Sequence, residues 1–195
     1  MELIFATGNP HKVAEVQYLL PEGIRIKTLR EIGIEEEIPE TGQTLEENAL
    51  LKAEYVRQRG SRDVFAEDTG LEVKALHNAP GVYSARYAGP ACDSRANLVK
   101  LLKEMEGQND RRARFRTVIA LILNEEIHRF EGIVNGQIAE TASGSGGFGY
   151  DPVFVPEGFD RSFAELGDEV KSRISHRARA MKKMISFLNT LRIQP

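Results

Sequence analysis

The chain has 195 residues, of which 41% are hydrophobic and 28% are charged, and its formal net charge is −3. This length predicts a single domain, residues 1–195, that buries about 70% of the surface of the unfolded chain. The small negative charge excludes a general attraction to nucleic acid or to an anionic membrane, so we expect neither as a partner.

The cysteine content and the hydropathy pattern favour a reducing compartment. The one cysteine, Cys92, cannot form an intramolecular disulfide. No apolar stretch approaches the roughly 20 residues that span a bilayer, and the N-terminus lacks the pattern of a signal peptide. We therefore expect a cytoplasmic protein.

The first part of the chain alternates between strand and helix patterns. Residues 3–6 are typical of a buried strand, residues 11–20 have helical apolar spacing, and residues 24–26 alternate like a strand. Residues 33–42 are acidic and loop-like. Thr44-Leu45-Glu46-Glu47 has the form of a capping box and predicts a helix that ends near residue 59.

The same alternation continues to the C-terminus, which predicts an α/β fold with a mixed sheet. Two short strands are expected on either side of Glu67-Asp68-Thr69-Gly70. The predicted elements after residue 60 are strands at 64–66 and 71–75, an ordered loop at 78–90, a helix at 94–105, an antiparallel pair at 115–123 and 129–139, a short strand at 153–155, and a helix from 176.

Residues 143–152, Ser-Gly-Ser-Gly-Gly-Phe-Gly-Tyr-Asp-Pro, form the most informative segment. Glycine allows the backbone to approach a ligand closely, and successive bare N–H groups form an anion-binding concavity. Phe148 or Tyr150 can stack on a flat ring, so a nucleotide is indicated. Glycine and serine alone would favour a flexible linker, but the aromatics and the apolar run that follows argue against one.

Thr7-Gly8-Asn9-Pro10-His11-Lys12 lies where the first predicted strand meets the first predicted helix. A helix N-terminus offers N–H donors and a partial positive charge to phosphate, and Lys12 adds a full charge. A simple helix cap by Thr7 or Asn9 is the alternative. Lys12 counts against that alternative because a cation opposes the helix dipole there.

Three further sets of charged or polar residues are candidates for chemistry. Asn48 and Lys52 share a helix face, although a solvated face is the ordinary explanation. Glu40 in a turn and Asp68 at a strand end are carboxylates of the kind that hold Mg²⁺. The structural alternative is that one caps a turn and the other forms an Asx-turn. The third set is the basic stretch at residues 171–177.

This stretch, Lys171-Ser172-Arg173-Ile174-Ser175-His176-Arg177, precedes the last predicted helix. Its cations oppose the preference of a helix start for acids. A solvated basic turn capped by Ser175 is one interpretation. The other is that His176 binds a base edge or a phosphate.

Taken together, these motifs resemble those of the inosine/xanthosine triphosphate pyrophosphatases, which remove non-standard purine nucleotides from the precursor pool. The resemblance covers about residues 2–190. The motifs that carry it, in order, are Thr7-x-Asn9-x-x-Lys12, Glu40-Thr41-Gly42, Glu47-Asn48-Ala49 with Lys52, Asp68-Thr69-Gly70-Leu71, Gly147-Phe148-Gly149-Tyr150-Asp151-Pro152 and Ser175-His176-Arg177.

The resemblance implies a two-lobed α/β fold with a long central mixed β-sheet flanked by helices, an active-site cleft between the lobes, and a homodimer. It implies Mg²⁺-dependent hydrolysis of ITP, dITP and XTP to the monophosphate and pyrophosphate. Asp68, Lys12 and Lys52 would be catalytic, and Glu40 and Asp68 would bind the metal. The implied substrate-binding residues are Thr7, Gly8, Asn9, Pro10, His11, Lys12, Asn48, Lys52, Thr69, Phe148, Gly149, Tyr150, Asp151, Lys171, His176 and Arg177.

Two other functions remain as alternatives. A Maf-type pyrophosphatase acting on pyrimidine or modified nucleotides would open with a serine- and arginine-rich motif instead of residues 7–12. A non-catalytic nucleotide sensor would gain nothing from Glu40 and Asp68, because added negative charge repels phosphate.

Many members of the resembled family have serine where this chain has Thr69, and the hydroxyl is retained.

Overall fold

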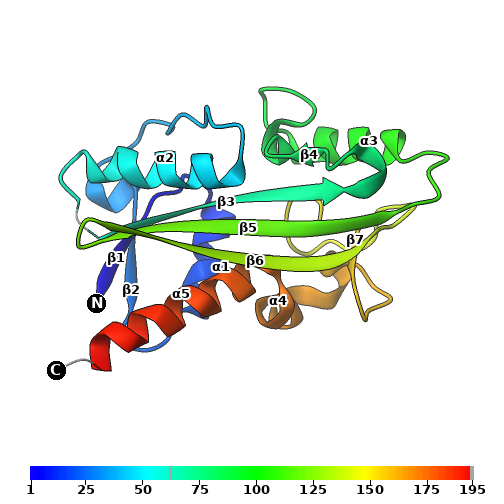
Figure 1. Ribbon diagram of the computed structural model, residues 1–195. Helices are drawn as coiled ribbons and strands as arrows, with labels where there is room; N and C mark the ends of the chain where they lie inside the picture. Colours follow the sequence, from blue (N-terminus) through cyan, green and yellow to red (C-terminus); the bar gives the residue numbers. More distant parts are fainter. Residues whose placement is uncertain (62, 194–195) are drawn as a thin grey trace. The chain divides into compact units, whose positions relative to one another are not determined.

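The computed structural model describes residues 1–61 and 63–193, which form one seven-stranded mixed sheet flanked by helices (Figure 1). The strand order is β2-β1-β3-β5-β6-β7, and β4 pairs with β3. β1 is parallel to β2 and β3, whereas β4 and β7 are antiparallel to their partners, so the predicted mixed α/β class is confirmed. The strands are β1 (Glu2–Phe5), β2 (Arg25–Thr28), β3 (Val64–Val73), β4 (Pro80–Gly81), β5 (Arg112–Leu123), β6 (Glu126–Ile138) and β7 (Phe154–Pro156).

Most of the helices begin at polar caps visible in the sequence. Asn9 caps the first helix, Asp93 caps the third, and Ser162 forms a capping box with Glu165. Thr44 accepts the N–H of Glu47, but the Glu47 carboxylate bonds the N–H of Gln43 instead of that of Thr44. The helices are α1 (Pro10–Leu19), α2 (Leu45–Arg57), α3 (Ser94–Glu104), α4 (Phe163–Ile174) and α5 (His176–Ile193), with 3₁₀ turns η1 (Arg30–Ile32), η2 (Lys74–Leu76) and η3 (Ser84–Arg86).

The chain divides into two compact units, each built from separate segments. The first unit contains Met1–Asp68, Thr117–Gly132 and the described residues from Arg177 onward, and the second contains Thr69–Arg116 and Ile133–His176. In the first unit α2 covers one side of the strands, and α1 and α5 cover the other (Figure 1). The rings of Phe5 and Phe65 stack at 4.5 Å in its core.

The second unit buries one face of its strands and leaves the other exposed. Phe115, Phe154 and Phe163 pack together on the buried face, beneath α3 and α4. The opposite face of β3, β5 and β6 carries polar side chains, since successive residues of a strand point to opposite faces.

β3 is one continuous strand through Glu67-Asp68-Thr69-Gly70, so the expectation of two short strands was wrong. Asp68 therefore lies inside a buried strand and not at a strand end. The carboxylates of Glu67 and Asp68 are paired with cations, which allows charged residues to occupy buried strand positions.

Two further differences concern local turns. β6 begins at Glu126, earlier than expected, because Asn124 and Glu125 close the hairpin in two residues with φ values of 49° and 70°. β5 ends at Leu123 as expected but begins earlier, at Arg112. α4 was missed, because Gly167 interrupts its helical pattern with φ +77°. No helix of the described chain is long and apolar enough to cross a membrane.

Candidate active site

Lys52 joins two carboxylates in the first unit. Its Nζ lies 2.5 Å from Glu40 Oε1 and 3.3 Å from Asp68 Oδ1. The side chains of Lys52 and Asp68 are buried, at 7% and 8% exposure, and Glu40 is 28% exposed. Burial opposes the charge of Lys52, but Asp68 and Glu40 outweigh it and raise the pKa of the lysine. The alternative of a solvated helix face is wrong for this residue.

Asn48 lies on the same face of α2 and binds Asp68 from a second direction. Its Nδ2 donates to Asp68 Oδ2 at 3.1 Å, and its Oδ1 accepts the N–H of Gly42 at 2.8 Å. A Cβ at Gly42 would lie 2.7 Å from Asn48 Oδ1, so the turn needs glycine to approach the amide. One turn of α2 thus fixes both oxygens of Asp68.

Glu67 is the centre of a second buried group of charges. Its carboxylate accepts hydrogen bonds from Arg177 Nε at 2.9 Å and Arg177 Nη2 at 2.7 Å, and Lys12 Nζ lies 3.4 Å away. Arg177 Nη1 also pairs with Glu15. Burial alone would raise the pKa of Glu67, but Arg177 and Lys12 lower it to about 2.

Glu67 and Glu15 were not predicted as site residues, and Arg177 was predicted to bind the substrate. Arg177 is 1% exposed and bound to both carboxylates. Glu67 carried a usable signal, since a charged residue beside Asp68 in an apolar strand requires a buried partner. Glu15 carried none, because a glutamate in a helix is ordinarily solvated.

At the start of α1 the structure shows the helix cap. Asn9 Oδ1 accepts the N–H groups of His11 at 2.9 Å and Lys12 at 3.4 Å, and Thr7 Oγ1 accepts the N–H of Asn9 at 3.2 Å. Gly8 is exposed, and no atom lies within 4 Å of the position that a Cβ would take. The side chain of Lys12 therefore offers the charge at this end, while Asn9 occupies two backbone donors.

In the second unit, Asp151 and Lys171 form a buried ion pair. Lys171 Nζ lies 2.6 Å from Asp151 Oδ2, and the two side chains are 4% and 3% exposed. The same oxygen accepts the N–H of Phe148 at 2.8 Å, and Lys171 Nζ lies 4.7 Å from the centre of the Phe148 ring. Lys171 belongs to the last turn of α4, so a solvated basic turn is excluded for it. Gly147 has φ +70°, and a Cβ there would lie 2.1 Å from Asp151 Oδ2.

The other predicted residues of this unit differ in accessibility. Tyr150 is buried, and its hydroxyl donates to the Ser84 carbonyl at 2.8 Å, so Phe148 is the more accessible ring of the two. His176 is buried and stacks on Phe115 at 4.6 Å. Thr69 and Gly149 are half-buried.

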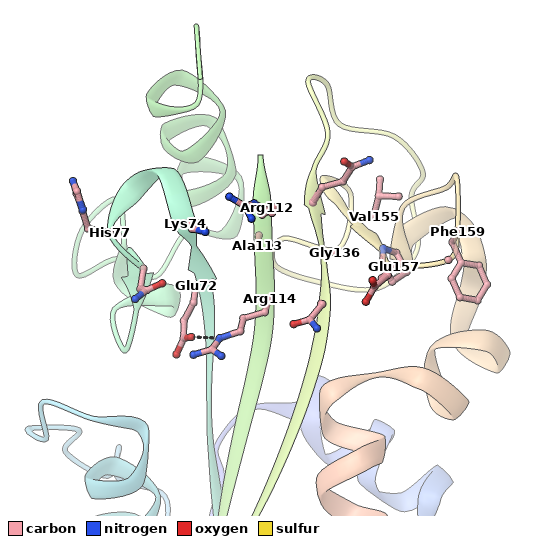
Figure 2. Close-up of a pocket in the computed structure, with 15 residues that line it drawn as sticks. Glu72, Lys74, His77, Arg112, Ala113, Arg114, Gly136, Val155, Glu157 and Phe159 are labelled. Carbon is pink, nitrogen blue, oxygen red and sulfur yellow. Dashed lines mark hydrogen bonds and ion pairs between the residues drawn. The ribbon is translucent and has the colours of Figure 1, made fainter. Parts of the chain in front are cut away.

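A hollow of about 890 Å³ lies on the exposed sheet face of the second unit, and no predicted site residue lines it (Figure 2). Its wall includes Glu72 and Arg114, which pair at 2.5 Å, together with Lys74, Arg112 and Glu157. None of the predicted residues lies in this hollow; they lie at the two buried charge groups and the capped helix start of the first unit and around the Asp151–Lys171 pair of the second.

Metal ligation is limited to a small donor set. Among residues 1–61 and 63–193, no group of three or more His, Cys, Asp or Glu side chains is placed to hold a metal ion. Glu40 and Asp68 are two carboxylates that already converge on one cationic atom, Lys52 Nζ. Proteins usually bind Mg²⁺ through one or two carboxylates, and substrate phosphates supply further ligands.

The fold and these charge groups define an α/β enzyme whose lysines and carboxylates suit a phosphorylated substrate. The Ham1 family profile matches residues 3–187, and the chain belongs to this family. The dITP/XTP pyrophosphatase of Porphyromonas gingivalis is 55% identical over 188 residues, 96% of this chain and 97% of that protein. The one from Flavobacterium johnsoniae is 51% identical over 188 residues, 96% and 98% of the two chains. The Staphylococcus aureus Ham1 protein has a solved structure with TM-score 0.88 and 38% identity, covering 98% of this chain and 100% of that one.

Proposed function

We propose that this chain hydrolyses ITP, dITP and XTP to the nucleoside monophosphate and pyrophosphate, and so removes deaminated purines from the nucleotide pool. The observation that carries the proposal is the near-full-length identity of about half to proteins named dITP/XTP pyrophosphatase. The buried lysine and carboxylate group around Asp68 is consistent with that chemistry. A cytoplasmic location follows from the substrate, because the precursor pool is held there.

We propose Mg²⁺ as the cofactor, held by Glu40 and Asp68. Both carboxylates approach one cationic atom, which is the charge arrangement that a divalent ion requires. When bound, Mg²⁺ supplies a Lewis acid that stabilises charge on the phosphoryl oxygens.

The protein residues have separate roles in the proposed reaction. Lys12 and Lys52 offset the negative charge of the triphosphate, which would otherwise repel an attacking water. Asp68 accepts the proton of that water as it attacks the α-phosphorus. Asn48 and Lys52 orient the Asp68 carboxylate, since each bonds a different one of its oxygens. Thr7 to His11 contribute the remaining contacts to the triphosphate.

We assign the nucleoside end of the substrate to Thr69, Lys171, His176 and the loop at residues 148–151, all of the second unit. Donors facing the purine 6-keto oxygen would accept hypoxanthine and xanthine, while a 6-amino group would leave buried donors unpaired. Phe148, with the Lys171 ammonium over its ring, is the candidate stacking surface.

The test is pyrophosphate release from ITP, dITP, XTP, GTP, ATP and dTTP, measured with and without Mg²⁺. We expect release from the first three substrates at a kcat/KM at least about 10²-fold above that for ATP, because an unpaired buried donor discriminates by this order or more. Preference for dTTP would support the Maf-type alternative. Binding of ITP without hydrolysis would support the sensor, and comparable rates on ATP and ITP would refute the purine selectivity.

We also propose that the protein is a homodimer that buries the exposed sheet face of the second unit. That face carries both signs of charge, Lys74 and Arg112 against Glu157, as a patch that meets its own copy about a two-fold axis requires. Sedimentation equilibrium should give a dimer mass, and the Lys74→Glu/Arg112→Glu variant should sediment as a monomer. A dimeric variant would place the interface elsewhere, and a monomeric wild type would refute the dimer.

A further inference from the structure

Glu67 has no part in the proposed reaction, yet it binds one of the proposed phosphate-binding lysines. Its carboxylate is 1% exposed and receives Arg177 on one side and Lys12 on another. A buried carboxylate requires such partners, because an unpaired buried charge is strongly destabilising. The question is whether the pairing serves only the fold or also the substrate.

Exposure differs among the members of this group. Glu67 and Arg177 are sealed at 1% each, whereas the Lys12 side chain is 14% exposed. Gly8, in the loop before the helix of Lys12, is exposed and has no atom within 4 Å of the position that a Cβ would take. Glu67 and Arg177 are therefore shielded from solvent, whereas Lys12 and Glu15, the latter at 23% exposure, reach it. Of these two exposed members, Lys12 is the cation and so the one suited to bind phosphate.

We propose that Glu67 is a positioning residue, which holds the ammonium of Lys12 in place for the triphosphate of the substrate. This inference rests on the proposed function of the same site. Arg177 fixes the Glu67 carboxylate through three hydrogen bonds, and the carboxylate in turn fixes Lys12. Glu15 pairs with the far side of Arg177, so the arginine keeps a counter-charge when Glu67 is altered.

The charges around Lys12 support the proposal that Glu67 acts on this lysine. Burial lowers the pKa of Lys12, and the positive charges of Lys52 on α2 and Arg177 on α5 lower it further. Glu67 and Asp68, both on β3, oppose these effects. Without Glu67 the lysine would thus be less well held in its charged form as well as less well oriented.

The experiment compares Glu67→Gln, Lys12→Met and the double variant, with Glu2→Gln as the matched control. Glu2 also lies on a strand of the first unit and pairs with a lysine, Lys27, at 2.8 Å, but its side chain is 55% exposed. Three quantities are measured: kcat and KM for XTP, the affinity for inorganic tripolyphosphate, and the melting temperature. Tripolyphosphate reports the phosphate site without requiring hydrolysis.

We expect Glu67→Gln to lower kcat/KM by about 10²-fold, the order of loss caused by a misplaced binding group. Tripolyphosphate affinity should fall with it, while Glu2→Gln should match the wild type in both. In the Lys12→Met background the same Glu67→Gln change should have little further effect, because the residue through which Glu67 acts is absent.

An equal loss in both backgrounds would overturn the proposal and leave Glu67 with a role in the fold alone. Unchanged tripolyphosphate affinity in folded Glu67→Gln would also overturn it. If that variant does not fold, Glu67→Asp keeps the charge and withdraws it by one methylene, and a wild-type KM in Glu67→Asp would refute positioning. A wild type that binds tripolyphosphate but does not cleave XTP would refute the proposed function instead.

Discussion

Asp68 is held by two side chains from a single turn of α2. Asn48 donates to one of its oxygens and Lys52 to the other, so the carboxylate has little freedom to rotate. A general base gains from such restriction, because the proton acceptor must lie within hydrogen-bond reach of the water that it activates.

We predict that Asp68→Asn folds normally and loses activity by about 10²–10⁴-fold, the usual contribution of a general base. The amide can still bond Asn48, and Lys52 keeps Glu40 as its counter-charge. Pyrophosphate release and circular dichroism check the two parts. Asp110→Asn, whose carboxylate pairs with the exposed Arg112, is the control. Turnover close to the wild type would remove Asp68 from the mechanism.

At this scale the sequence predicted residue types better than residue partners. Glu40, Asn48, Lys52 and Asp68 were expected to act in one site, and the structure brings these four together. The placement of Arg177 could not be foreseen, because its partner Glu67 is 110 residues away along the chain. Spacing along a helix reveals neighbours within a few residues, whereas such contacts depend on the tertiary fold.

Among the elements, the capped helices were the most predictable. Thr44 caps a helix where the sequence predicted it, since a cap is a local interaction. β3 was predicted as two short strands because acidic residues in mid-strand are typical of a turn. The buried cations that pair with them were not evident from the sequence. α4 had a capping box at Ser162 and Glu165 that would have revealed it.

Within the second unit, Tyr150 joins the glycine-rich loop to β3 and β4. Its hydroxyl bonds the Ser84 carbonyl, and Ser84 Oγ in turn donates to the Gly81 carbonyl at 2.6 Å and accepts the N–H of Leu71 at 2.9 Å. The loop that carries Phe148 is therefore tied to β3 and β4 through a chain of hydrogen bonds.

We predict a specific pH dependence of stability from Tyr150. Burial, and then the nearby Tyr87 and Glu104, raise the pKa of its phenol above the ordinary value. The folded state thus keeps the proton where the unfolded state loses it, so stability is retained below about pH 10 and falls as the pH rises further. Urea unfolding at pH 7 and above pH 10 measures this decline.

Tyr150→Phe should be less stable at pH 7 by about 1 kcal/mol, the net value of a lost hydrogen bond. Its stability should decline less steeply above pH 10, so that the two proteins converge there. Tyr18→Phe, at a position 68% exposed, is the control and should parallel the wild type. Parallel curves for Tyr150→Phe would show that the phenol does not carry the effect.

At the scale of the whole molecule, the two units are interleaved along the chain. Arg112–Leu123 and Glu126–Ile138 each contribute residues to both units, as does Val64–Val73. Neither unit is a continuous stretch that could be cut from the sequence. The single domain expected from the length is therefore retained as a prediction about folding.

We predict one cooperative unfolding transition, because a strand shared by both units cannot melt in one and persist unchanged in the other. Calorimetry should give equal calorimetric and van't Hoff enthalpies, and circular dichroism and tyrosine fluorescence should coincide during urea unfolding. Two resolved heat-absorption peaks would contradict this expectation.

The position of Lys52 between Glu40 and Asp68 has a consequence for storage and purification. Its ammonium pairs with both carboxylates and so offsets their mutual repulsion. We therefore predict that the fold does not depend on a divalent ion in the way that a zinc finger does. Dialysis against EDTA should abolish pyrophosphate release and leave the melting temperature unchanged, and adding Mg²⁺ back should restore activity at once. A fall in melting temperature would show that the Lys52 ammonium does not replace the divalent ion in stabilising the fold. We therefore expect Lys52 to serve as the counter-ion of both carboxylates until the proposed Mg²⁺ and the substrate bind.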